Sequence, residues 1–202
     1  MKSVAVVGQT NVGKTSFCLN FAAFLGLKTI TINFSHHERG CYTKTFSISE
    51  AQSLLVSEQP HQTRDMQSMV LTLPWGKGEK QFELIDTAGL TNSIHHEEDI
   101  RKAMAQTLRY IRQAEIILHI LDSARIMEVG LLKGIGEIDY QIAQFGQLKP
   151  GYVILANKMD LPHASEGLEK IKQEFPGNRV IGVSAVTKYG FKEVKSFVKQ
   201  HL

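Results

Sequence analysis

Short apolar runs alternate along this chain with longer segments in which apolar residues recur every three or four positions. Apolar runs of this length are typical of buried strands, and they cover residues 3–7, 115–121, 151–156 and 179–183. The helical period predicts helices over residues 15–25, 97–113, 137–145 and 168–175, and a terminal helix from about residue 191. Strands that alternate with helices predict a doubly wound α/β fold, in which helices flank a mostly parallel six-stranded sheet.

A β-hairpin is predicted in the first half of the chain. Residues 66–73 and 81–86 are β-prone segments, and they flank the turn Pro74-Trp75-Gly76-Lys77-Gly78. The hairpin supplies two further strands, and the second of them ends at Asp86.

The segment before this hairpin has mixed character. Residues 28–34 alternate between apolar and polar side chains and predict an extended segment, and a polar stretch over 35–45 follows. Ser47 and Glu50 have the spacing of a helix capping box, which predicts a short helix near residues 49–57.

Composition places the chain among ordinary globular proteins. Its 202 residues suffice for one domain, with 43% hydrophobic residues and a net charge of +3. Two distant cysteines imply no disulfide framework, and no apolar run is long enough to span a bilayer. We therefore expect a single domain over residues 1–202, without a membrane span and located in the cytoplasm.

A glycine-rich segment between the first strand and the first helix fits the phosphate-loop pattern G-x-x-x-x-G-K-[ST]. In this setting, backbone N–H groups and the helix N-terminus bind phosphates, Lys14 reaches the β- and γ-phosphates, and Thr15 offers its hydroxyl to Mg²⁺. The predicted nucleotide-binding residues here are Gly8, Gln9, Thr10, Asn11, Val12, Gly13, Lys14, Thr15 and Ser16.

A second candidate segment, Asp86-Thr87-Ala88-Gly89, ends the hairpin. An aspartate at the end of a strand beside a phosphate loop can hold Mg²⁺ through a water molecule. Gly89 can bring its N–H close to a γ-phosphate because glycine has no side chain. We therefore expect Asp86 to be a metal residue and Gly89 to take part in catalysis.

The third candidate segment, Asn157-Lys158-Met159-Asp160, follows a predicted buried strand. The Asp160 carboxylate can accept two hydrogens from the N1 and N2 edge of guanine, and adenine lacks that pair of donors. The Lys158 stem can lie on the base. Ser184 and Ala185, after the last strand, can offer a backbone N–H to the guanine O6.

These segments, in this order, resemble the Ras-like P-loop GTPases over essentially the whole chain. Within that class the sequence is similar to the TrmE–Era–EngA group, which has an asparagine at the position of Asn11, a T-T-R-D element and a hydrophobic residue after D-T-A-G. The matching residues here are Asn11, Gln62-Thr63-Arg64-Asp65 and Leu90. The resemblance implies a GTP-binding domain that binds GTP or GDP with Mg²⁺ and hydrolyses GTP.

The resemblance also implies particular roles. Thr63 is the expected switch I threonine, closing on Mg²⁺ and the γ-phosphate, with Thr43 and Thr45 as alternatives. The distance from the first helix to Thr63 indicates an insertion in switch I at about residues 35–60. Leu90 stands where Ras-type enzymes place a water-orienting glutamine, so intrinsic hydrolysis should be slow.

Asn11 is the candidate for supplying the catalytic element in place of the glutamine that Leu90 replaces. In the TrmE-like group an asparagine here can ligate K⁺, so the resemblance implies K⁺ as a second cation. The alternative is that Asn11 bonds only its own backbone. Together with Lys14, Thr63 and Gly89, Asn11 completes the predicted catalytic set.

Two hypotheses for the function follow. The first is a GTPase switch that acts on a protein or an RNA-containing particle, by analogy with relatives. The second is a nucleotide-regulated binding module with negligible turnover, in which a nucleotide-dependent homodimer is the functional form. Adenine specificity is disfavoured by Asn157 and Asp160. The sequence is compatible with both a complete small protein and a domain of a longer one.

Overall fold

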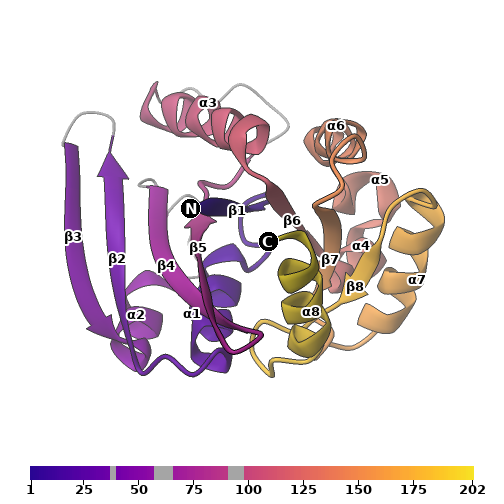
Figure 1. The fold of residues 1–202 in the computed structure, drawn as a ribbon. Coiled ribbons are helices and arrows are strands. Elements are labelled where there is room, and N and C mark those ends of the chain that lie inside the picture. The colour runs from indigo at the N-terminus through magenta and orange to yellow at the C-terminus, as the bar shows by residue number, and fades with distance from the viewer. Residues whose placement is uncertain (37–39, 57–65, 91–97) are drawn as a thin grey trace.

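A computed structural model describes residues 1–36, 40–56, 66–90 and 98–202. Within these ranges eight strands form one sheet in the order β3-β2-β4-β5-β1-β6-β7-β8, and helices cover both of its faces (Figure 1). The strands are β1 Lys2–Val7, β2 Thr29–His36, β3 Gly40–Ser47, β4 Met66–Trp75, β5 Gly78–Asp86, β6 Ile116–Asp122, β7 Tyr152–Asn157 and β8 Val180–Gly182.

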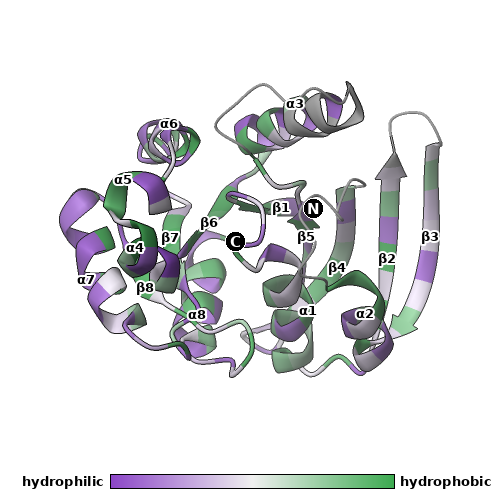
Figure 2. Cartoon of the chain, turned by 180° about the vertical axis from the view of Figure 1, so that it is seen from behind, coloured by the Kyte–Doolittle hydropathy of each residue, from purple (hydrophilic) through white to green (hydrophobic). Residues whose placement is uncertain are grey.

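The helices form two layers. One hydrophobic cluster packs the sheet against α1 Lys14–Phe24, α2 Ile48–Leu55 and α8 Phe191–His201. The other packs it against α3 Glu98–Gln113, α4 Ser123–Val129, α5 Leu131–Gly134, α6 Glu137–Gly146 and α7 Ala164–Glu174. Figure 2 shows hydrophobic residues on the strands at the centre of the sheet and hydrophilic ones on outer helices such as α7. The predicted doubly wound α/β fold is confirmed.

The parallel part of the sheet runs from β5 through β1, β6 and β7 to β8. In its register Val6 lies beside Asp86, and Asp122 lies beside Asn157. The carboxyl ends of these strands therefore open at one edge of the sheet, where the predicted site residues follow them.

The predicted number of strands is wrong, because the described sheet has eight rather than six. The two additional strands are β2, which confirms the predicted extended segment over residues 28–34, and β3, and they pair antiparallel beyond β4. Residues 35–45 have the composition of a loop, yet their polar side chains form cross-strand bonds: Thr31 to Thr45 at 2.9 Å and Thr43 to Asn33 at 2.8 Å. An exposed edge strand needs few apolar residues, so its sequence carries little strand signal.

The capped helix after β3 is confirmed. Ser47 is the N-cap of α2, with its hydroxyl accepting from the N–H of Glu50 and the Glu50 carboxylate accepting from the N–H of Ser47. Within the described ranges, no helix is both long enough and apolar enough to cross a membrane.

Candidate functional site

The phosphate loop lies between β1 and α1 and contains two glycines with positive φ. Gly8 has φ 145° and Gly13 has φ 95°. A Cβ on Gly8 would lie 2.4 Å from the carbonyl oxygen of Ile120, and one on Gly13 would lie 2.5 Å from Nδ2 of Asn157. Both positions therefore require glycine for conformation and for close approach.

Lys14 is buried at the start of α1, where its Nζ donates to the carbonyl oxygens of Gly8 at 3.2 Å and Gln9 at 2.6 Å. Burial lowers the pKa of Lys14 to about 8, against the opposing attraction of Asp86. A buried ammonium that donates to carbonyl oxygens gains strongly from an anion nearby, so the loop carries a positive charge suited to phosphate.

Thr15 and Asp86 meet at the end of β5. The Thr15 hydroxyl donates to Oδ2 of Asp86 at 2.6 Å. Asp86 is fully buried, and its Oδ1 has no hydrogen-bond partner among the described residues. Burial raises the pKa of this carboxyl to about 6. A hydroxyl beside a carboxylate with an unused oxygen is a donor set that suits Mg²⁺ and its bound water.

Gly89 lies directly against the phosphate loop. A Cβ at this position would be 2.5 Å from Cγ2 and 2.8 Å from Cα of Thr10. The following residue, Leu90, donates its N–H to the carbonyl oxygen of Gly8 at 3.2 Å, and its side chain is buried. Position 90 therefore joins the two loops through its backbone, and its side chain is part of the core.

The loop after β7 is fixed by Asn157. Its Nδ2 donates to the carbonyl oxygen of Val12 at 2.7 Å, and its Oδ1 accepts from the N–H of Ala185 at 2.9 Å. Asp160 is exposed, and its Oδ1 accepts from the Ser184 hydroxyl at 2.6 Å. The two predicted base-recognition segments are thus in direct contact with each other and with the phosphate loop.

Two site residues have partners that the sequence analysis missed. Lys158, at φ 67°, places its Nζ 2.6 Å from Oδ2 of Asp122, which is also the N-cap of α4. The side chain of Gln9 donates to the buried carboxylate of Asp139 in α6. An acidic residue at a strand end was the available signal for Asp122, whereas nothing in the local sequence pointed to Asp139.

The remaining predicted residues are placed as follows. Asn11 is exposed in the loop with φ 62°, and Ser16 lies in the first turn of α1. Thr63 lies outside the described residues. Its two alternatives, Thr43 and Thr45, are both in β3 and bonded to β2.

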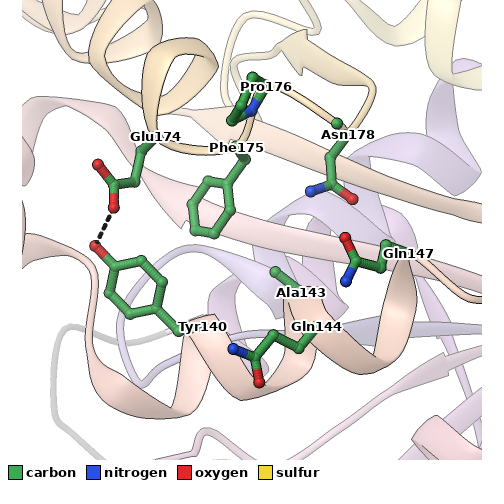
Figure 3. A pocket seen from close by; sticks show the side chains of 9 residues that line it. Tyr140, Ala143, Gln144, Gln147, Glu174, Phe175, Pro176 and Asn178 are labelled. Atoms are coloured by element: carbon green, nitrogen blue, oxygen red, sulfur yellow. Dashed lines mark hydrogen bonds between the residues drawn. The ribbon is translucent and has the colours of Figure 1, made fainter.

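A separate cavity of about 320 Å³ lies between α6 and the end of α7 (Figure 3). Tyr140, Phe175 and Asn178 are among the residues that line it, and none of the predicted site residues does so. The Tyr140 hydroxyl donates to Oε1 of Glu174 at 2.9 Å. This cavity and the phosphate loop are therefore formed by different residues.

Comparisons with known proteins agree with this geometry. The model of the family described as "50S ribosome-binding GTPase" matches residues 44–158. GTPase Obg of Ruminiclostridium cellulolyticum is 27% identical over 128 residues, which are 61% of this chain and 29% of that protein. GTPase Der of Thermodesulfovibrio yellowstonii is 29% identical over 180 residues, 85% of this chain and 32% of that protein. The chain thus spans about a third or less of these relatives.

Solved structures show the same fold. A variant of Aquifex aeolicus Era bound to GDP·AlF₄⁻ has a TM-score of 0.68 at 20% identity, covering 100% of this chain and 57% of that one. Era in complex with MgGDPNP and a 16S ribosomal RNA segment has a TM-score of 0.66 at 22% identity, covering 100% and 56%. Because the family match extends over more than half of the chain, this protein belongs to the 50S ribosome-binding GTPase family, within the P-loop GTPases of the TrmE–Era–EngA-like group.

Proposed function

We propose that this chain is a single GTP-binding domain that binds GTP and GDP with Mg²⁺, hydrolyses GTP and changes conformation between the two states. The observation that carries the proposal is the contact of Asn157 with Val12, which joins the base-recognition loop to the phosphate loop. The relatives named GTPase Obg and GTPase Der support the activity.

The proposed roles combine the contacts of the described residues with the resemblance to the TrmE–Era–EngA group. The backbone of residues 8–13, Lys14 and Ser16 bind phosphates, and the exposed carboxylate of Asp160 binds the guanine edge. Thr15, Asp86 and Thr63 hold Mg²⁺, which neutralises charge on the phosphates when bound. Ala185 already donates its N–H to Asn157, so its contact with the guanine O6 would share this donor.

Leu90 offers the hydrolytic step no polar group, because its side chain is apolar and is buried in the core. We propose that K⁺ held by Asn11 supplies the missing positive charge. The exposure of Asn11 at the loop surface supports this role. The alternative function, a nucleotide-dependent homodimer with negligible turnover, is favoured by the same buried leucine.

The partner is proposed to contain RNA or protein, because one structural neighbour, Era, was solved with 16S ribosomal RNA. Two free cysteines, one buried and one exposed, fit a reducing compartment such as the cytoplasm. The insertion at about residues 35–60 offers β3 and α2 as the surface for such a partner.

The test is GTP hydrolysis by the purified chain in K⁺ and in Na⁺ buffer, with an Asn11→Ala variant and size measurements in GDP and in a non-hydrolysable GTP analogue. Faster turnover in K⁺ that Asn11→Ala abolishes supports the K⁺ proposal, and equal rates in both salts contradict it. Dimer formation with the analogue but no turnover in either salt would favour the binding module.

A further inference from the structure

A buried polar chain leads from the phosphate loop into the opposite helix layer. Gln9, the second residue of the loop, donates its side-chain amide to Oδ2 of Asp139. The other oxygen of Asp139 lies 3.0 Å from Nε2 of His119, whose Nδ1 lies 2.9 Å from the hydroxyl of Tyr152. The loop, α6, β6 and β7 are thus connected by this series of hydrogen-bonded side chains.

This carboxylate is completely enclosed. Asp139 and His119 both have 0% exposure, and Oδ2 of Asp139 also accepts the N–H of Gly136 at 3.1 Å. A buried pair of hydrogen-bonded polar side chains is costly to desolvate and adds little net stability over apolar residues of similar volume. Fold stability alone therefore does not explain a polar side chain at this position.

The position of Gln9 suggests what the carboxylate does. The backbone of Gln9 pairs with Leu90, and its carbonyl oxygen accepts from Nζ of Lys14. His119 of β6 lies beside Val7 of β1 in the sheet register, and Val7 comes two residues before Gln9 in the sequence. The start of the loop is therefore held from one side by the segment after β5 and from the other side by α6.

We propose that Asp139, supported by His119, is a positioning residue that fixes the phosphate loop through Gln9 in the conformation that receives phosphates. This inference rests on the proposed nucleotide binding. The side-chain NH2 group of Gln9 donates to Asp139, and the backbone N–H of Gln9 is the group that we assign to the phosphates. Loss of the contact between Gln9 and Asp139 lets the loop adopt other conformations. The apparent phosphate affinity then falls in proportion to the fraction of molecules that leave the binding conformation.

Phosphate binding and base binding should respond differently to the loss of these contacts. GDP uses the loop, whereas guanosine depends on Asn157 and Asp160, which the polar chain does not contact. Breaking the hydrogen bonds among Gln9, Asp139 and His119 should therefore raise the Kd of GDP and leave the Kd of guanosine unchanged. A general loosening of the fold would weaken both.

The test is a double-mutant cycle on the full chain, read by titration with Mg·GDP and, by NMR, with guanosine. Gln9→Met removes the donor at a partly exposed position, and Asp139→Leu removes the carboxylate. We expect each to raise the Kd of GDP by about tenfold, as for one hydrogen bond to a charged group. The double variant should be no weaker than Asp139→Leu, because both changes break the same contact.

Two further variants serve as controls. Asp139→Asn keeps an oxygen for Gln9 and Gly136 and offers an N–H to His119, whose other nitrogen can then donate to Tyr152, so near wild-type affinity is expected. Tyr140 follows Asp139 in α6, and Tyr140→Phe breaks its bond to Glu174 of α7 (Figure 3), which should leave both affinities unchanged.

The outcomes are distinct. Unchanged GDP affinity in Gln9→Met, fully additive effects, or an equal loss of guanosine affinity would overturn the inference while leaving GDP binding by the wild type intact. If Asp139→Leu fails to fold, Gln9→Met with the guanosine comparison decides alone. A wild-type chain that binds no GDP would overturn the proposed function as well.

Discussion

The side-chain amide of Asn157 donates a hydrogen bond to the carbonyl oxygen of Val12 over 2.7 Å. The oxygen of the same amide accepts from the N–H of Ala185 at 2.9 Å. Asn157 is buried, and Gly13 must lack a side chain because a Cβ there would lie 2.5 Å from the Asn157 Nδ2. One amide therefore sets the relative positions of three loops that are distant in the sequence.

Substituting Asn157 by alanine leaves a buried carbonyl at Val12 and a buried N–H at Ala185 without their partner. We expect the free energy of unfolding to fall by about 2 kcal/mol. The affinities for GDP and for guanosine should fall together, by at least about tenfold, because both loops lose their position. Chemical denaturation and nucleotide titration measure the two effects, with Asn178→Ala, at the rim of the separate cavity, as the control. Wild-type affinity in Asn157→Ala would contradict the role of this contact.

Asp86 is predicted to lower the stability of the nucleotide-free protein at neutral pH. Burial raises its pKa from 3.8 to about 6, so between these values the native state binds more protons than the unfolded chain. The free energy of unfolding therefore falls as pH rises through this window, by on the order of 3 kcal/mol in total, and the loss persists above it.

Asp86→Asn should remove this penalty. We expect the variant to be more stable than the wild type at pH 7 and to match it near pH 4, while the Mg²⁺ dependence of GDP binding is lost. Urea denaturation at both pH values, without nucleotide, measures the stability. A variant less stable than the wild type at pH 7 would show that the buried carboxylate stabilises the fold.

Gly89→Ala is predicted to impair the GTP-bound state. The added methyl group would lie 2.8 Å from the Cα of Thr10, so the phosphate loop and the segment after β5 must separate. Overpacking of this kind costs about 1–3 kcal/mol, which corresponds to roughly tenfold or more in affinity for a GTP analogue. GDP should be affected less, because it has no γ-phosphate for the Gly89 N–H.

Gly177→Ala is the matched control, since a Cβ there meets nothing within 4 Å. Titration of both variants with GDP and with the GTP analogue gives the comparison. If Gly89→Ala binds the two nucleotides in the wild-type ratio, Gly89 has no part in sensing the γ-phosphate.

The meeting of the candidate site's segments was predictable because these segments directly follow apolar strands. The phosphate loop, Asp86 and Asn157 each come at the end of such a strand, and parallel pairing brings those ends together. The capping box of α2 was predictable for a similar reason, since it depends on two residues three positions apart.

The rest depends on contacts that local patterns do not encode. β3 is a polar edge strand whose side-chain bonds form only with β2. The partners of Gln9 and Lys158 are Asp139 and Asp122, which lie in other elements and are distant in sequence. A single polar residue in an apolar segment, such as His119, indicates that a buried partner exists without identifying it.

We propose that this chain selects guanine nucleotides through the Asp160 carboxylate beside Ser184. The most direct measurement is a competition titration in which GDP, ADP and xanthosine diphosphate displace a fluorescent guanine nucleotide from the wild type and from Asp160→Asn. GDP should displace it at least about a hundredfold better than ADP from the wild type. The affinity of Asp160→Asn for xanthosine diphosphate relative to GDP should be higher than that of the wild type, because the new amide N–H can donate to O2 of xanthine. Equal displacement by GDP and ADP from the wild type would contradict guanine selection by Asp160.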